Sequence, residues 1–329
     1  MTNEGHLQNI ALVGASGTIG SQILNHLLET NKFHVTVISR SDSKATFPSH
    51  SSLTVHKGSY SDPEFLQTAF SNQDAAVIAL NFMAMGLQPG IIEAAAKAGV
   101  KWIVPTEYAM DGLNETLAKN LSKVPIMLPK VMARKQVEEL AQAYPGLSWI
   151  GVATNPWTEF NLAQGGLGFN IPSRTATLYS GAGLFNSVTL PQAGLGIARL
   201  LSLPLTNSSN PRASLAYYAN NFVYLSSFLI SQDVLFDSLK RVTGTADGDW
   251  KITQSSIEEW EKACFEGLAK GDMRSAGGLI FVNYMGEGRG GNYEAKAKVD
   301  REVLGLEEED LDAAVKKAVD AGEVEKVFK

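Results

Sequence analysis

The sequence predicts an α/β fold class, with a doubly wound parallel sheet followed by a smaller C-terminal α/β lobe. Two observations predict it. Short apolar runs alternate with helical patterns through the first half of the 329-residue chain, and a glycine-rich stretch joins the first run to the first helix. Nearly continuous apolarity is typical of parallel strands that are covered on both faces. The runs fall at residues 10–13, 35–38, 53–55, 75–80, 102–104 and 149–152.

Helical patterns fall between these runs. Pro63 near the start of "SDPEFLQTAF" predicts one helix, while Pro89 and Gly99 bound another in "PGIIEAAAKAGV". Strand–helix–strand alternation implies right-handed crossovers, so the sheet is predicted to be wound in both directions. The first helix has apolar residues at 3.6-residue spacing, namely Ile19, Ile23, Leu24, Leu27 and Leu28.

The second half of the chain is less regular. Residues 187–203 and 221–243 each read as a strand followed by a helix, and Ser231 and Gly244 are predicted to cap and end the second of these helices. We expect both strands to return to the main sheet and the remaining strands to form a smaller lobe. The stretch 165–183, "GGLGFNIPSRTATLYSGAG", is rich in glycine and turn residues and predicts irregular structure.

Composition excludes several classes of protein. The formal net charge of −6, from 28 Lys and Arg against 34 Asp and Glu, argues against nucleic acid as a partner. No apolar run approaches the ~18 residues that a membrane span needs. The lone Cys264 permits no intramolecular disulfide and fits a reducing compartment, so we expect a cytoplasmic protein. Its histidines are scattered without ligand spacing, which predicts no metal site.

The stretch "VGASGTIG" places Gly14, Gly17 and Gly20 between the first apolar run and the first helix. Helix N-termini bind phosphate through free N–H groups and the helix dipole, and glycine lets the backbone approach the phosphates closely. This context predicts a Rossmann-type dinucleotide site. Its predicted cofactor-binding residues are Gly14, Ala15, Ser16, Gly17, Thr18, Ile19 and Gly20.

Arg40 stands where the second run ends, in "HVTVISRSDSK". Sites for NAD usually carry Asp or Glu at this place, which bonds the ribose 2′-OH. A guanidinium can instead hold a 2′-phosphate through charge-assisted hydrogen bonds, with Ser41 and Lys44 nearby. We therefore expect NADP(H) as the cofactor. The alternative is that Arg40 is only a solvated surface residue.

Ligands of open parallel sheets lie at the carboxyl ends of the strands. The residues that follow the later runs are therefore predicted to contact the cofactor at Asn81, Phe82, Thr106, Glu107, Asn155 and Pro156. The predicted substrate-binding residues are Met83, Tyr108, Trp157 and Phe160. The alternative for the aromatic residues is core packing, and Glu107 can equally be a structural carboxylate.

The motifs "VGASGTIG", Arg40, "IVPTEYAMD" and "GVATNPWTEFNLA" resemble the NmrA-like and isoflavone reductase-like family of atypical short-chain dehydrogenases, particularly its fungal members. The resemblance implies a Rossmann domain that binds NADPH and a C-terminal lobe that closes over a small aromatic or polyketide-like substrate. Accordingly, we expect residues 1–156 to form the NADP-binding domain. Residues 157–329 then form the substrate-binding region, interleaved with the returning strands near 187–203 and 221–243.

A catalytic lysine is also implied by this resemblance. No tyrosine in the chain has a lysine four positions later, as short-chain dehydrogenases usually do. The family's reductases instead use a lone lysine near the nicotinamide, and "KVMARKQVE" aligns with that helix. Lys130 falls at the catalytic place and Met132 replaces a second family lysine. Lys135 is the second choice for the acid/base group.

These observations predict an NADPH-dependent oxidoreductase that transfers a hydride to a small aromatic or polyketide-like secondary metabolite, with Lys130 as acid/base. Two alternatives stay open. One is an NADP-binding regulator without catalysis, and the other is an enzyme that keeps the cofactor but catalyses a non-redox cyclisation or isomerisation. The sequence leaves the substrate, the hydride face and the oligomeric state open.

Overall fold

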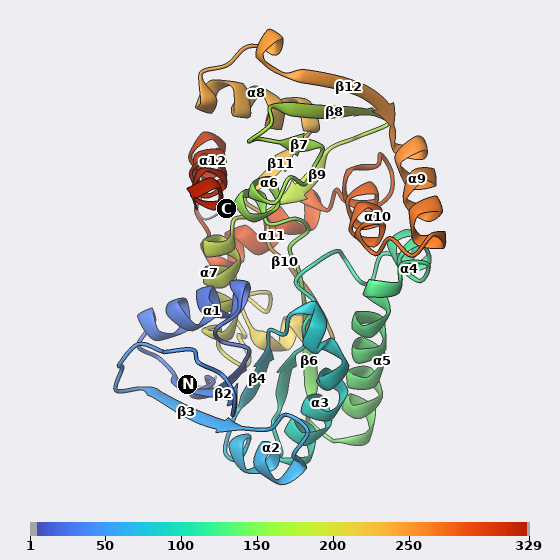
Figure 1. Ribbon diagram of the computed structural model, residues 1–329. Helices are drawn as coiled ribbons and strands as arrows, with labels where there is room; N and C mark the ends of the chain where they lie inside the picture. Colours follow the sequence, from blue (N-terminus) through green and yellow to red (C-terminus); the bar gives the residue numbers. More distant parts are fainter. Residues whose placement is uncertain (1–4, 328–329) are drawn as a thin grey trace.

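A seven-stranded sheet forms the centre of the protein in the computed structural model, which describes residues 5–327. Its strand order is β10-β6-β5-β4-β1-β2-β3, and every neighbouring pair is parallel (Figure 1). The predicted doubly wound α/β fold class is therefore confirmed. The strands are β1 (Asn9–Val13), β2 (His34–Arg40), β3 (Leu53–Gly58), β4 (Ala75–Ile78), β5 (Trp102–Val104), β6 (Ser148–Ala153) and β10 (Asn221–Tyr224).

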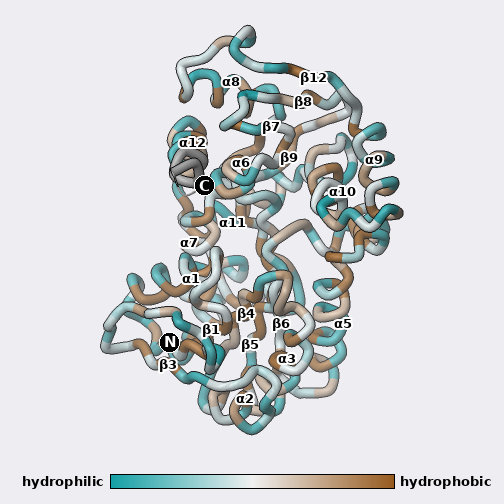
Figure 2. Tube along the Cα trace, viewed as in Figure 1, coloured by the Kyte–Doolittle hydropathy of each residue, from teal (hydrophilic) through white to brown (hydrophobic). Residues whose placement is uncertain are grey.

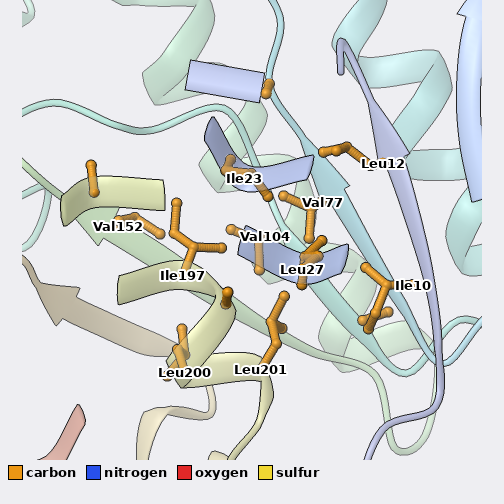
Figure 3. Packing of buried hydrophobic residues seen from close by; sticks show 14 of the residues in the cluster. Ile10, Leu12, Ile23, Leu27, Val77, Val104, Val152, Ile197, Leu200 and Leu201 are labelled. Carbon is orange, nitrogen blue, oxygen red and sulfur yellow. The ribbon is translucent and has the colours of Figure 1, made fainter. Parts of the chain in front are cut away.

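Helices cover both faces of this sheet because its strands are apolar on both sides. On one face α1 (Thr18–Glu29) packs against α7 (Leu190–Leu201). Figure 3 shows Ile23 and Leu27 of α1 beside Ile197, Leu200 and Leu201 of α7. The other face carries α2 (Pro63–Ala69), α3 (Gln88–Lys97) and α5 (Leu128–Ala143), and α11 (Glu294–Leu304) contributes to both cores.

A second lobe follows with its own hydrophobic core. It contains a three-stranded sheet in the order β12-β8-β7 and the two-stranded pair β11-β9. Its strands are β7 (Phe169–Asn170), β8 (Thr175–Ser180), β9 (Phe185–Ser187), β11 (Phe228–Ile230) and β12 (Lys251–Ser256). Its helices are α6 (Thr158–Ala163), α8 (Gln232–Thr243), α9 (Ile257–Ala269), α10 (Arg274–Met285) and α12 (Leu311–Val327). In Figure 2 apolar segments gather along central strands such as β4.

Local signals set several of these boundaries as the sequence predicted. Asp62 caps α2 by accepting from two backbone N–H groups, and Pro63 occupies its first turn. Ser231 caps α8, which ends at Gly244 in the left-handed conformation. Cys264 is buried on α9, where it packs as a small apolar residue.

The structure differs from the sequence prediction in the second half. Residues 165–183 contain β7 and β8 rather than irregular structure alone, because β8 pairs with β12 along its whole length. Of the two strands expected to return to the main sheet, only β10 does so, beside β6. The short β9 instead pairs with β11 in the antiparallel direction, and its three residues are all buried.

The ends of the two expected regions, residues 1–4 and 328–329, lie outside the described residues. Three connecting pieces complete the first half: the 3₁₀-helix η1 (Phe82–Leu87), the short helix α4 (Glu115–Leu121) and the 3₁₀ turn η2 (Pro125–Met127). The second half also contains η3 (Leu215–Tyr218) and η4 (Asp247–Asp249). Within residues 5–327, none of the helices combines the length and apolarity needed to cross a bilayer.

Candidate active site

The turn from β1 to α1 leaves no room for side chains. Gly14 has a φ of +83°, and a Cβ there would lie 2.2 Å from the carbonyl oxygen of Ala79. A Cβ on Gly20 would lie 2.1 Å from the carbonyl oxygen of Gly14. These two glycines therefore let α1 pack directly on β1 and on the end of β4.

Gly17 has a different role in the same turn. It is the N-cap of α1, and no side chain accepts the N–H groups of the first turn. A Cβ at Gly17 would meet its nearest atom at 3.2 Å, so packing alone does not require glycine there. Gly17, Thr18 and Ile19, at this N-terminal end of α1, line a cavity. This uncapped, side-chain-free N-terminus fits the diphosphate of a dinucleotide.

The cavity has a volume of about 390 Å³ and lies at the carboxyl ends of β4, β5 and β6. Strand ends from both halves of the sequence meet there, as the rule for open parallel sheets predicts. It brings together twelve of the predicted residues: Gly17, Thr18, Ile19, Asn81, Phe82, Thr106, Tyr108, Lys130, Asn155, Pro156, Trp157 and Phe160.

The other predicted residues lie outside this wall. Met83 is 95% exposed and does not line the cavity. Glu107 lies behind Lys130. Four of the others belong to the turn between β1 and α1 or to the start of α1: Gly14, Ala15, Ser16 and Gly20. The remaining three lie at or just after the end of β2: Arg40, Ser41 and Lys44.

The sequence did not identify the wall that the second lobe supplies. Gly277, Ile280, Phe281 and Tyr284 of α10 close the cavity, together with Ile126 and Met127 before α5. The only sequence signal on α10 is the apolar run "GLIFVNYM", and the two glycines within the helix weaken the helical pattern. The position of α10 beside the cavity depends on long-range packing, which no local pattern encodes.

Arg40 is exposed at the end of β2, and its Nε lies 3.6 Å from Oδ1 of Asp42. The Tyr60 hydroxyl donates to the carbonyl oxygen of Ile38 beneath this strand end. Burial raises the pKa of Tyr60 to about 12, and the nearby Arg40 charge opposes that rise. Within residues 5–327 the guanidinium has one ion-pair partner, the exposed carboxylate of Asp42, so it can still bind another anion.

Lys130 is buried near the start of α5, where its ammonium donates to the backbone carbonyl oxygen of Glu107. Its Nζ lies 5.6 Å from the centre of the Phe82 ring. Burial lowers the pKa of Lys130 to about 8, and the Glu107 charge partly opposes this. Lys135, by contrast, is exposed and does not line the cavity.

Two cavity residues have backbone conformations that are uncommon for side-chain-bearing residues. The φ of Tyr108 is +35° and that of Asn155 is +51°. Asn155 is fixed by its Nδ2, which donates to the carbonyl oxygen of Gly291 at 2.6 Å. Such strain persists where the surroundings over-determine it and is common at functional sites.

Two aromatic side chains give the cavity a flat apolar surface. Trp157 and Phe160 pack edge to face, with ring centres 5.7 Å apart. Thr106 joins the end of β5 to the end of β4, since its hydroxyl donates to the Ile78 carbonyl oxygen and accepts from the Leu80 N–H. Among the described residues, no three His, Cys, Asp or Glu side chains gather as a metal site would require.

Comparisons with known proteins agree with this geometry. Residues 14–164 match the family model described as NAD(P)H-binding. The chain is 29% identical over 313 residues to oxidoreductase aprR of Aspergillus flavus, covering 93% of this chain and 97% of that protein. It is 28% identical to oxidoreductase poxI of Penicillium oxalicum over 74% of this chain and 72% of that protein.

Solved structures share the whole fold. The structure described as AtPrR2 with NADP+ and (+)pinoresinol superposes with a TM-score of 0.72 at 18% identity, over 96% of this chain and 100% of that chain. An isoflavone reductase gives a TM-score of 0.69 at 16% identity, over 94% and 99%. The triphenylmethane reductase of Citrobacter sp. gives 0.65 at 20%, over 95% and 99%.

Residues 14–164 therefore match an NAD(P)H-binding domain, in agreement with the glycine turn and the cavity, and the relatives that match most of the chain are named oxidoreductases. The chain has the isoflavone reductase-like fold, and the resemblance in its sequence motifs is confirmed. The nicotinamide dinucleotide cofactor predicted from residues 14–20 is confirmed as well.

Proposed function

We propose that this protein uses NADPH to reduce a small aromatic or polyketide-like secondary metabolite in the cytoplasm, and that Lys130 supplies the proton. The observation that carries the proposal is the buried ammonium of Lys130 in a cavity walled by aromatic side chains and open to the glycine turn. We also propose the functional division at residue 156, with the cofactor on residues 1–156 and the substrate largely on residues 157–329.

Each part of the site has a role in this proposal. The N–H groups at the start of α1 bind the diphosphate, and Arg40 binds the 2′-phosphate. When bound, the cofactor supplies a hydride. Trp157 and Phe160 hold a flat substrate by apolar contact and exclude water. Lys130 donates a proton to the substrate atom that becomes basic after reduction.

The AtPrR2 structure with pinoresinol and the triphenylmethane reductase are proteins of this fold whose names refer to compounds with aromatic rings. An aromatic acceptor therefore heads the substrate panel that tests the proposal. Loss of NADPH absorbance with a reduced product supports it. Product without NADPH consumption favours the non-redox alternative, and tight NADPH binding without any product favours the regulator.

Replacing Arg40 by alanine is expected to weaken NADPH binding roughly ten- to a hundredfold, while NADH binding changes little, because one charge-assisted contact is lost. Calorimetric titration of both nucleotides measures the two affinities. Arg212→Ala, at an exposed arginine in the loop after α7, is the matched control and leaves both affinities unchanged. Equal affinity of the native protein for NADH and NADPH contradicts the assignment.

A further inference from the structure

A second, smaller cavity lies behind Lys130. It has a volume of about 10 Å³ and is lined by residues of α4, α5 and the segment after β5. Ala109, Met127 and Lys130 line both this back cavity and the main one. Lys130 is the titratable residue among these three, so its side chain connects the two spaces.

Three charged side chains border the back cavity, namely Glu107, Lys130 and Arg134. The Glu107 carboxylate lies 3.5 Å from Nη1 of Arg134, whereas Lys130 contacts the backbone carbonyl of Glu107 rather than its carboxylate. The oxygen that faces Arg134 is Oε1, which is buried and makes this ion pair but no hydrogen bond within residues 5–327. A buried carboxylate oxygen without a hydrogen bond is costly, which indicates that something else binds there.

One water molecule fits these requirements. A buried water needs a cavity volume of roughly 10–15 Å³ and two to four polar partners. The back cavity offers about 10 Å³, and its polar groups are the Glu107 carboxylate, the Lys130 ammonium and the Arg134 guanidinium. The rest of its wall is apolar, including Ala118 and Leu121 of α4, so the water has no other side chain to bind.

We propose that Glu107 re-protonates Lys130 through a single water molecule in the back cavity. The inference rests on the proposed function. The hydride carries both electrons from NADPH to the substrate, and Lys130 gives its proton to the substrate. The neutral amine then takes a proton from the water, which takes one from the Glu107 carboxyl group. The Glu107 carboxylate recovers its proton from solvent, so one solvent proton is consumed per turnover.

The titration of the two groups supports this direction of transfer. Burial raises the pKa of Glu107 to about 7, opposed by the charges of Arg134 and Lys130 and reinforced by Glu138. The pKa of Lys130, at about 8, lies close to it, so a proton passes between them at little cost. Arg134 and Glu138 belong to α5, and α4 contributes apolar side chains to the cavity. Glu107 is a positioning and relay residue here, because it does not line the main cavity.

Two variants test the relay. Glu107→Gln keeps the shape but carries no transferable acid proton, and Ala118→Val fills the back cavity while leaving both charged groups in place. Each is expected to lower turnover about 10–100-fold near pH 7 without changing NADPH affinity. In mixtures of light and heavy water the native rate over multiple turnovers should depend non-linearly on deuterium content, because each new cycle needs Lys130 to be re-protonated. Both variants should give a linear dependence. Glu139→Gln, at an exposed carboxylate of α5 outside both cavities, should behave as native.

A readout that needs no turnover separates this inference from the proposed function. Acylation of Lys130, followed by mass spectrometry over a pH series, reports the lysine pKa in the native protein and in Glu107→Gln. Loss of the carboxylate should lower that pKa further, because its charge favours the ammonium. A crystal structure should place one water between the two side chains. An empty back cavity, or an unchanged deuterium dependence in both variants, overturns the relay even if the enzyme reduces its substrate.

Discussion

Replacing Lys130 by methionine is expected to lower turnover by roughly 10²–10⁴-fold, the usual contribution of a positioned general acid. Methionine is close to the lysine stem in shape, so the cavity should keep its form and NADPH affinity should change little. Single-turnover NADPH oxidation measures the loss, and calorimetry measures the affinity. Turnover should also decline as pH rises through about 8 in the native protein, because the ammonium is the proton donor.

Lys135→Met gives the decisive comparison. Lys135 lies on the same helix but is exposed and outside the cavity, so its loss should leave turnover within the experimental error. Full turnover in Lys130→Met would remove the acid/base role from Lys130, and a large loss in Lys135→Met instead would transfer it.

Lys130→Met should also raise the free energy of unfolding. The pKa of Lys130 is about 8 in the folded state against 10.5 unfolded, so between those values the unfolded chain binds more protons and native stability rises with pH. Below pH 8 the buried ammonium costs at most about 3 kcal/mol, from 1.36 kcal/mol per pKa unit. Thermal unfolding of Lys130→Met should therefore show its largest gain below pH 8 and a shrinking gain toward pH 10. An unaltered difference across that range would contradict the burial cost.

Gly14→Ala is expected to destabilise the protein by about 2–5 kcal/mol. The added Cβ would lie 2.2 Å from the carbonyl oxygen of Ala79, and the φ of +83° is unfavourable for any residue with a side chain. The Ala79 carbonyl belongs to the backbone directly after β4, so the clash can be relieved only by moving the end of β1 or of β4. Denaturant unfolding measures the change, and NADPH binding should be lost with it.

Gly17→Ala separates folding from binding in the same turn. Its φ is ordinary and the nearest atom is 3.2 Å from the added methyl group, so stability should fall by less than about 1 kcal/mol. NADPH affinity should nevertheless drop, since the methyl group would stand where the diphosphate approaches. Gly90→Ala in α3 meets nothing within 4 Å and should stabilise slightly. Equal losses of stability for Gly14→Ala and Gly17→Ala would contradict the division of roles.

The first half of the fold could be predicted because its signals are local. Each of the six apolar runs became a strand of the main sheet, and Asp62, Pro63 and Ser231 set helix ends through contacts within a few residues. The pairing of β9 with β11 depends on partners far apart in sequence, and the glycine content of residues 165–183 conceals the alternation that β8 uses to pair with β12.

The site residues also divide into those that local sequence position predicts and those that long-range packing brings to the cavity. Residues at strand ends, such as Thr106 and Asn155, were predictable because the rule for parallel sheets fixes where strand ends meet. Glu107 was identified, but its position behind Lys130 follows from how α5 packs and not from its place after β5. Phe281 and Tyr284 reach the cavity through the packing of a whole lobe, which the sequence does not reveal.

The contact between α1 and α7 bears on how the chain can be recombined. A Cβ on Gly194 of α7 would lie 2.7 Å from the backbone of Gln22, so these helices touch almost main chain to main chain. A gene fragment ending at residue 156 would leave the apolar side of α1 bare. Any exchange of segments between homologous genes must therefore carry α7 and β10 with the nucleotide-binding part.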